Sequence, residues 1–388
     1  MRLLDRAVFP RNKPCGGGIS GRVLRRFPYL RPELGRIDTH EVSRLYLEGP
    51  AGESTVIESD VPAALMIRRV EFDALLTSLA VEAGAELVTG VDVVQAHEAG
   101  GRVTLTARDG RRFESATVIA ADGVYSVVAR RLGLNPGWPA TSLALDMMEE
   151  TPRAALRDVD PSTLWIAYGF NPLASPEGKA APEGYAYIFP KRDHVNVGIG
   201  YVLSYFRDQV HAEPYELQRT FVDRLRARGI VVGESVRANF TPFQIPVGGP
   251  LAKPGRGRVL LAGDAGGFVN GFTAEGIYYA MVSGDVAART IAESRGEQGV
   301  ELAERYRRAV GAEIGPELRD SVLIQRYLFG DRGRIAAIIR QAPRQTTMTR
   351  LILDFAVGRR SYRNLRWQVL ARAPLLAFKF ARESLASR

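Results

Sequence analysis

The feature that most constrains the fold is an apolar strand that ends in Gly-Asp and leads shortly afterwards into a helix. Residues 258–262 read as a fully buried strand, and Gly263-Asp264 follows it directly. Ligands of doubly wound α/β folds bind at the carboxyl edge of the sheet, so Asp264 is placed to accept hydrogen bonds from sugar-type hydroxyls. A helix is expected over about 273–293, with Thr273 as N-cap. The free N–H groups at the start of this helix, around Glu275-Gly276-Ile277, could donate hydrogen bonds to a diphosphate or to an electron-rich ring edge.

An alternative is an ordinary strand–turn–helix whose glycines serve only the turn. Other segments nevertheless fit an α/β nucleotide-binding domain assembled from separated parts. The expected elements are a strand end at 2–5 closed by Asp5, a proline-rich loop at 9–14, a helix from about 70 to a stop at Gly84, a strand at 86–94, a hairpin turning at Asp109-Gly110, and a short strand at 117–120 that runs into Ala121-Asp122-Gly123.

Residues 140–250 have a different texture, in which proline-rich loops separate alternating aromatic strands. This pattern is typical of an antiparallel sheet over a substrate cavity. Tyr185, Tyr187 and Phe189 recur at every second residue, so in a strand they share one face. We expect residues 196–200 to form the paired strand, with glycines that leave space for a ligand. The aromatic face is either packed on its own core or forms one wall of a long apolar tunnel.

Composition favours a globular protein, since 46% of the 388 residues are apolar and can form a substantial core. No apolar run is long enough to span a membrane, no secretory signal opens the chain, and the single cysteine, Cys15, excludes an internal disulfide. We therefore expect a cytoplasmic location. The histidines lack the spacing of metal ligands and no nucleic-acid-binding module is recognisable, so neither a metal nor a nucleic-acid partner is expected.

The net charge of +9 is concentrated in a helical C-terminal region, residues 301–388. This region holds 18 Lys and Arg against 8 Asp and Glu, whereas the first 300 residues are nearly neutral. Within it, residues 365–380 mix Trp and Phe with basic side chains. Such a segment suits peripheral contact with an anionic membrane, at the inner face of a cytoplasmic membrane, or else a helix packed on the domain.

Five motifs together resemble FAD-dependent oxidoreductases of the aromatic-hydroxylase fold group and, within that group, the geranylgeranyl reductase family. The motifs are Gly263-Asp264 with Glu275-Gly276-Ile277, the Ala121-Asp122-Gly123 turn, residues 69–73 (RVEFD), residues 13–18 (KPCGGG) and residues 182–190 (PEGYAYIFP). The resemblance covers residues 1 to about 300. It implies a Rossmann-like FAD-binding domain in two parts, 1–139 and 251–300, a β-rich substrate domain at 140–250, and the basic helical region after residue 300.

The resemblance also implies roles for individual residues. It places Cys15 near the flavin on the substrate side, where its thiol is a candidate proton donor, although a small apolar filler in a turn is the alternative. Arg69 would contact the cofactor, or its neighbour Arg68 would do so instead. The alternative for Arg69 is a side chain exposed to solvent without a cofactor contact. Asp122 would either cap the following helix or approach the cofactor. Expected cofactor contacts are Asp5, Arg6, Cys15, Gly16, Gly17, Arg69, Val93, Ala121, Asp122, Gly263, Asp264, Gly276 and Ile277, and expected substrate contacts are Tyr185, Tyr187, Phe189 and Pro190.

Three departures from the family pattern stand out. Tyr187 occupies the place where the aromatic motif usually has Trp. Val269-Asn270 follows the Gly-Asp turn where aromatic hydroxylases carry Pro, which favours a reductase over a hydroxylase. The chain also begins at what the family has as its second strand. Either the first strand and its G-x-G-x-x-G turn lie upstream, which we favour because loss of a central strand would leave unpaired backbone groups inside a sheet, or this form lacks the main contacts to the FAD diphosphate. The literal G-x-G-x-x-G at 16–21 follows a proline-rich loop, not a strand, and is interpreted as a coincidence.

The function that this resemblance implies is reduction of carbon–carbon double bonds in an isoprenoid chain carried by a lipid, quinone or pigment. FAD is the expected cofactor, and the reductant is NAD(P)H or another electron carrier. Two alternatives stay open at this point. One is a flavin-dependent aromatic or quinone monooxygenase, and the other is a non-catalytic protein that binds apolar lipids.

Overall fold

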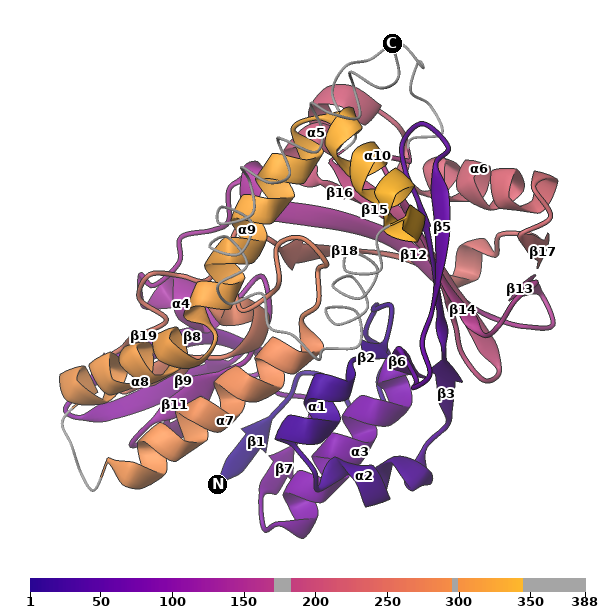
Figure 1. Ribbon diagram of the computed structural model, residues 1–388. Coiled ribbons are helices and arrows are strands. Elements are labelled where there is room, and N and C mark those ends of the chain that lie inside the picture. The colour runs from indigo at the N-terminus through magenta and orange to yellow at the C-terminus, as the bar shows by residue number, and fades with distance from the viewer. Residues whose placement is uncertain (171–182, 295–298, 345–388) are drawn as a thin grey trace.

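The largest element of the structure is a seven-stranded sheet in the order β18-β12-β16-β15-β14-β4-β5 (Figure 1). In this computed structural model, residues 1–170, 183–294 and 299–344 are described. The strands of the large sheet, in chain order, are β4 (Arg44–Glu48), β5 (Ser54–Glu58), β12 (Leu143–Pro152), β14 (Thr163–Tyr168), β15 (Gly184–Pro190), β16 (His194–Val202) and β18 (Phe240–Pro246). Neighbours run antiparallel except β14 and β4, which are parallel.

The predicted pairing inside this sheet is confirmed, because Tyr187 lies opposite Gly198 and Phe189 opposite Asn196. The sheet also takes in residues 44–58, which the sequence pattern had placed with the nucleotide-binding part. Alternation separates the two faces. Ala186 and Ile188 join a core that helix α6 (Pro214–Ala227) covers, whereas Tyr185, Tyr187 and Phe189 lie on the other face, hereafter the front face.

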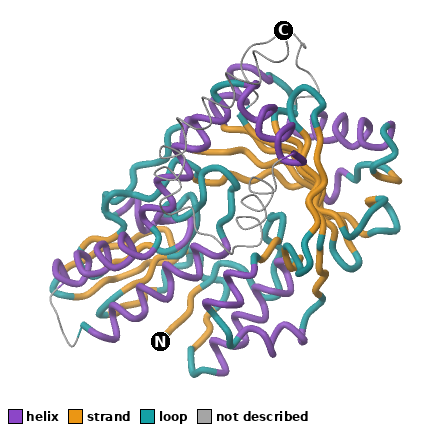
Figure 2. The backbone as a smooth tube through the Cα atoms, in the orientation of Figure 1, coloured by secondary structure: helices purple, strands orange, loops and turns teal. Residues whose placement is uncertain are grey.

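The second part of the fold is made of two- and three-stranded sheets, most of which lie away from the large sheet (Figure 2). Two pairs are parallel, β1 (Arg2–Leu4) with β7 (Glu86–Val88) and β11 (Val118–Ala120) with β20 (Val259–Leu261). The remaining strands in this part are antiparallel: β19 (Gly255–Arg256) beside β20, β8 (Val93–Ala99) with β9 (Arg102–Ala107) and β10 (Arg112–Ser115), and β2 (Gly18–Ile19) with β6 (Ala64–Ile67) and β3 (Thr39–Val42). Chain segments far apart in sequence thus build one Rossmann-like α/β part, as predicted.

Helices cover these small sheets. Helix α7 (Ile277–Glu293) packs with α8 (Gly299–Glu313) and with the short α1 (Gly21–Arg26) around a shared apolar core that includes Val23, Val282 and Tyr306. Helix α3 (Arg69–Glu82) is the predicted helix over 70–83, and Gly84 ends it with a positive φ of 91°. Other short elements include α2 (Leu30–Glu33), α4 (Val127–Arg131), α5 (Leu203–Tyr205), the π-helical turn η3 (Phe206–Val210) and the pair β13 (Leu156–Asp158) with β17 (Val231–Gly233).

The described part of the C-terminal region continues as α9 (Gly315–Phe329) and α10 (Arg332–Gln341). Helix α10 lies beside β5 (Figure 1). Leu328, Phe329, Ile335 and Ile339 of these helices pack on apolar residues of β4 and β5. The helical pattern predicted from residue 301 is therefore confirmed over the described residues. The amphipathic segment 365–380 lies outside them.

Two local predictions were wrong. The strand expected at 86–94 is two strands, β7 and β8, because Gly90 has φ +67° and turns the chain between them. Thr273 is not the N-cap of α7. The helix begins at Ile277, and the Thr273 hydroxyl instead accepts a hydrogen bond from the Glu275 amide inside the preceding loop, at 3.3 Å.

Candidate active site

The centre of the candidate site is the loop Cys15–Gly18, which lies against the front face of the large sheet. The Asn196 side chain donates to the Cys15 carbonyl at 3.1 Å, and the Lys191 ammonium donates to the Gly16 carbonyl. A Cβ on Gly16 would lie 2.6 Å from the Phe189 ring. The loop therefore requires glycine here, because the backbone contacts an aromatic side chain directly.

Gly17 is constrained still more tightly. Its φ of 70° lies in the left-handed region, and a Cβ would overlap the Ile67 carbonyl and the Lys191 ammonium. The Gly17 carbonyl accepts the Ile67 amide at 2.9 Å, which ties the loop to the end of β6. The glycines predicted to flatten this loop thus serve two different contacts, an aromatic ring at Gly16 and backbone at Gly17.

The Cys15 thiol lies among polar groups. Its sulfur accepts the Gly17 amide at 3.4 Å, and it interacts with the Arg69 guanidinium. Arg69 is also bonded to Asp73 at 2.7 and 2.8 Å. Burial lowers the pKa of Arg69, but Cys15 and Asp73 raise it more, and the net shift is upward. The open choice for Arg69 is therefore resolved against a solvated side chain.

Lys191 is a buried cation that sequence reasoning missed, although it follows the aromatic motif directly. Only 1% of the residue is exposed, and its ammonium lies 3.9 Å from Glu150. Burial lowers the pKa of Lys191 to about 8, while Glu150 and Cys15 act in the opposite direction. Arg68 bonds Glu150 at 2.9 Å, so the neighbour of Arg69 belongs to this second ion pair.

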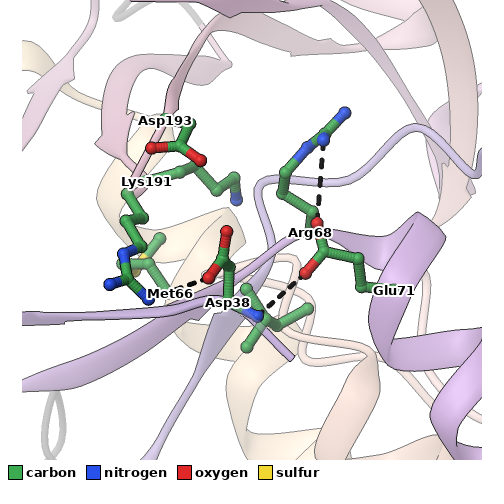
Figure 3. A pocket seen from close by; sticks show the side chains of 8 residues that line it. Asp38, Met66, Arg68, Glu71, Lys191 and Asp193 are labelled. Carbon is green, nitrogen blue, oxygen red and sulfur yellow. Dashed lines mark hydrogen bonds and ion pairs between the residues drawn. The ribbon is translucent and has the colours of Figure 1, made fainter. Parts of the chain in front are cut away.

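Lys191 also lines a small polar hollow (Figure 3). Asp38, Arg68, Glu71, Lys191, Arg192 and Asp193 are among the residues that line it. Asp38 pairs with Arg192 at 2.8 Å, and its amide donates to Glu71 at 3.0 Å. Charged side chains dominate this lining, Arg68 also pairs with Glu71 at 3.7 Å, and Tyr185, Tyr187 and Phe189 are not among the lining residues, so the hollow does not suit an apolar chain.

The Gly263-Asp264 turn forms the second wall of the candidate site. It follows β20 as a short 3₁₀ helix, and the Gly263 amide donates to the Ser283 hydroxyl at 2.9 Å. The Asp264 carboxylate lies 3.8 Å from the Lys13 ammonium, so the turn faces the loop that carries Cys15. Gly276 would present a Cβ 3.6 Å from Asp264, which brings the start of α7 to the same place.

The residues of this wall fit a flavin dinucleotide. Helix α7 has 17 residues and no side-chain cap at Gly276, so the Ile277 turn offers free amide groups and a positive dipole end. Asp264 supplies a carboxylate acceptor beside them. An orphaned acceptor also points to a missing partner, because the buried Asn196 side-chain oxygen has no hydrogen bond among the described residues.

Asp5 lies at the end of β1, as predicted, and is connected to the same region by charges. Its carboxylate accepts the Ala7 amide at 2.8 Å and lies 3.4 Å from Arg11, which bonds Asp73 at 3.0 Å. Asp73 in turn holds Arg69. Arg6, by contrast, is exposed and stands outside this chain of ion pairs.

The remaining predicted cofactor residues lie apart from the Cys15 loop. Asp122 accepts the Val128 amide at 3.1 Å and the Ser126 hydroxyl at 2.5 Å, which matches the helix-capping alternative for this residue. Ala121 beside it is exposed. Val93 begins β8 and packs on the core beneath β11 and β20, so its side chain has a packing role in this structure.

The aromatic row of β15 extends into a larger aromatic surface. Phe189 and Tyr187 lie with ring centres 4.6 Å apart, and Tyr185 donates to the Thr273 carbonyl at 2.6 Å. Tyr168 of β14 stacks on Phe272 at 5.5 Å, and Phe272 contacts Phe329 of α9. Pro190 is buried where β15 ends. The face that sequence spacing predicted therefore connects the Cys15 loop to the loop before α7.

Asp146 of β12 is a further buried group that the sequence pattern did not single out. Its carboxyl oxygens lie 3.1 and 3.2 Å from the Tyr187 hydroxyl. Burial raises the pKa of Asp146 to about 7, and the same burial raises the pKa of Tyr187 well above its ordinary value. No group of three or more His, Cys, Asp or Glu side chains in the described ranges could hold a metal ion.

Helix α9 anchors this region from the C-terminal side. Glu317 forms a two-pronged ion pair with Arg22 at 2.6 and 2.9 Å and accepts the Tyr279 hydroxyl at 2.6 Å. Ser321 accepts the Gly271 amide at 2.8 Å. The loop between Asp264 and α7 is thereby held by a helix that the sequence analysis had described only as part of a basic helical region.

Comparison with known proteins agrees with this geometry. The FAD binding domain family matches residues 34–313. The chain is 29% identical to digeranylgeranylglycerophospholipid reductase 2 of Methanothermobacter thermautotrophicus over 81% of this chain and 78% of that protein. It is 31% identical to the menaquinone reductase of Mycolicibacterium smegmatis, over 74% and 69% of the two chains.

A crystal structure supports the same fold. It is that of a geranylgeranyl bacteriochlorophyll reductase-like protein from Thermoplasma acidophilum, which matches with a TM-score of 0.77 and 19% identity over 95% of this chain and 92% of that one. The fold, the sequence motifs and the family match agree with one another. The chain therefore belongs to the FAD-binding domain family and, within it, to the geranylgeranyl reductase family of FAD-dependent oxidoreductases.

Proposed function

We propose that the protein saturates carbon–carbon double bonds in an isoprenoid chain carried by a lipid, a quinone or a pigment. The observation that carries this proposal is the continuous aromatic surface of Tyr185, Tyr187 and Phe189 beside the Cys15–Gly18 loop. Flat aromatic side chains suit an extended unsaturated hydrocarbon, which offers few polar groups for recognition. The names of the relatives, reductases of a digeranylgeranyl phospholipid and of menaquinone, support the same substrate class.

The cofactor supplies hydride when it is reduced, and the chain supplies binding and orientation. We assign the flavin side of the site to the Cys15–Gly18 loop, Asp264 and the start of α7 at Gly276 and Ile277. Residues 1–139 and 251–300 would hold the cofactor and residues 140–250 the substrate. Asp5 would face the adenosine ribose. NAD(P)H or another electron carrier would be the reductant.

Residues 301–388 would bring the site to its lipid substrate at the cytoplasmic face of a membrane. Their excess of Lys and Arg supports contact with anionic headgroups. No helix in the described part of the chain is long and apolar enough to cross a membrane. Sedimentation with vesicles tests this part of the proposal. Binding should be stronger to anionic than to neutral vesicles and should weaken as salt is added.

The substrate proposal is tested by incubating the protein, with bound FAD reduced by dithionite, with menaquinone and with a digeranylgeranyl phospholipid in separate reactions. Mass spectrometry should show two added hydrogens per saturated double bond in at least one lipid. A product that carries an added oxygen, formed only in air, would favour the monooxygenase alternative. Tight binding of lipid without any product would favour the apolar-lipid-binding alternative.

A further inference from the structure

The starting observation is that the Tyr187 side chain crosses a neighbouring strand. Tyr187 lies on β15 opposite Gly198 of β16, while Asp146 lies on β12 opposite Gly200 of the same strand. A Cβ on Gly198 would overlap the Tyr187 hydroxyl. The glycine therefore leaves the space through which the phenol reaches a carboxyl group two strands away.

Within the described part of the chain, no ion pair holds the Asp146 carboxyl ionised. Tyr187 is its recorded hydrogen-bond partner, at 3.1 and 3.2 Å, and none of the ion pairs between described residues includes it. The residue is 9% exposed and Tyr187 is 4% exposed. Because an unpaired buried carboxylate is costly, burial raises the pKa of Asp146 to about 7, and the group keeps its proton below that pH.

Other titratable groups surround the pair from each neighbouring element. Tyr185 comes from β15, and Cys15 comes from the N-terminal loop, which also carries Lys13. Lys13 lies 5.8 Å from the ring centre of Phe243, the β18 residue opposite Asp146, and it pairs with Asp264. Glu150 lies further along β12, where Arg68 and Lys191 neutralise it.

The pair also lies next to the reaction site proposed above. Tyr187 contacts the ring of Phe189, and a Cβ on Gly16 would lie 3.8 Å from the Tyr187 ring. Tyr185, on the same face, donates a hydrogen bond to the Thr273 carbonyl, and a carbonyl has no proton to supply. Tyr187 differs because its partner is a carboxyl group that can itself carry a proton.

Resting on the proposed reduction, we propose that Tyr187 donates the proton that completes saturation of the alkene and that Asp146 replaces it. One alkene carbon gains a hydride drawn from the reduced cofactor, and the other gains the Tyr187 proton. The π bond breaks, two C–H bonds form, and the cofactor is oxidised by two electrons. As this proton leaves, Asp146 passes its own proton to the Tyr187 oxygen in the same step, and Asp146 then takes one from solvent.

This assignment is a property of this chain. The family usually carries Trp at the Tyr187 place, and an indole N–H is far too weak an acid to act as a proton donor. Tyr187 is thus the proposed catalytic residue, and Asp146 is the proposed positioning residue that acts through it. Cys15 is the competing donor, and variants distinguish the two.

The test compares Tyr187→Phe, Tyr187→Trp, Asp146→Asn and Cys15→Ser in single turnovers of the reduced protein with the lipid that the unmodified protein saturates. Tyr201→Phe is the matched control, because it removes another buried hydroxyl, bonded to the Phe170 carbonyl at 2.6 Å, from the opposite face of the same sheet. General acid catalysis predicts a loss of about 100- to 10,000-fold for both Tyr187 variants. Tyr201→Phe should react at the unmodified rate.

The rate of the unmodified protein should fall as the pH rises through about 7, because Asp146 then loses its proton. Asp146→Asn should be slow and lack this pH dependence. Infrared difference spectra between acidic and alkaline samples should show a protonated carboxyl band that Asp146→Asn removes, which tests the protonation of this group directly, whereas the loss of the pH-dependent rate in Asp146→Asn is the result that a purely structural role would not give. The infrared readout needs no substrate.

Product formation by the Tyr187 variants at the unmodified rate would overturn the inference and leave the proposed reduction intact. A loss confined to Cys15→Ser would assign the proton to the thiol instead. Absence of the infrared band would also overturn the inference, because Asp146 would then have no proton to supply. If the unmodified protein saturates neither lipid, the proposed function fails first, and this inference falls with it.

Discussion

Two ion pairs join α1 to the C-terminal helices, and they differ mainly in burial. Arg22 and Glu317 have side chains only 10% and 3% exposed, whereas Arg26 and Glu313 are each 33% exposed. Removing one partner of a buried pair leaves an uncompensated charge and costs about 3–5 kcal/mol. Removing one partner of an exposed pair costs about 0–1 kcal/mol. Glu317→Gln should therefore destabilise the protein far more than Glu313→Gln.

The structure sharpens this difference. Glu317 also accepts the Tyr279 hydroxyl, so its replacement weakens a second buried bond. Arg26 keeps Asp285 as a partner when Glu313 is changed, so the loss of stability at the exposed site is smaller. The free energy of unfolding from urea titration followed by circular dichroism measures both effects in the same protein.

A double variant tests the reasoning behind the magnitude. Arg22→Met combined with Glu317→Leu removes both charges and should recover most of the lost stability, because apolar side chains avoid the cost of burying ions. Equal losses for Glu317→Gln and Glu313→Gln would refute the argument from burial. A double variant less stable than Glu317→Gln would show that the helices depend on the charges themselves.

Three further results are expected. In urea titration, Gly17→Ala should destabilise the protein more than Gly52→Ala does, because both glycines have a positive φ but only Gly17 has neighbouring atoms where the new Cβ would lie. Equal losses of stability would contradict the packing described for the Cys15 loop. Lys191→Met should speed amide hydrogen exchange in residues 15–18 roughly 10- to 100-fold, because it removes a charged hydrogen bond to the Gly16 carbonyl. Exchange in β8 and β9 should stay unchanged and serves as the internal control. Unchanged exchange in residues 15–18 would mean that other contacts hold the loop. Burial raises the pKa of Glu149 to about 7, so the contribution of this group to the free energy of unfolding is fully present below about pH 4.5 and is lost as the pH rises through 7. The free energy of unfolding should therefore fall by roughly 3 kcal/mol between these pH values, and Glu149→Gln should remove this decline. Parallel curves of stability against pH for the two proteins would count against the prediction.

The sequence patterns that predicted the fold correctly are local ones. The apolar run before Gly263-Asp264 predicts β20 because a buried strand needs only a short stretch of apolar residues. The alternation of Tyr185, Tyr187 and Phe189 predicts a shared face because side chains in a strand alternate. Thr273 misled because a threonine before a helical pattern is an ordinary N-cap signal, whereas the loop here continues to Gly276.

The interactions that were missed depend on the register of distant segments. Asp146 meets Tyr187 only because β12 and β15 flank a strand with glycine at the crossing point. Arg22 and Glu317 are separated by 295 residues and become neighbours only after α9 packs on α1. Lys191 follows the aromatic motif, but nothing in its neighbours along the chain indicates that an ammonium would be buried against the Gly16 carbonyl.

The most direct test of the central claim is anaerobic reoxidation of the reduced flavin by lipid. The purified protein with FAD bound is reduced by a measured amount of dithionite, mixed with menaquinone or a digeranylgeranyl phospholipid, and followed by visible absorption. Our account predicts that the oxidised flavin spectrum returns without oxygen, with one saturated double bond for each flavin oxidised. Flavin that stays reduced until air is admitted, with the lipid chains unchanged, would contradict it.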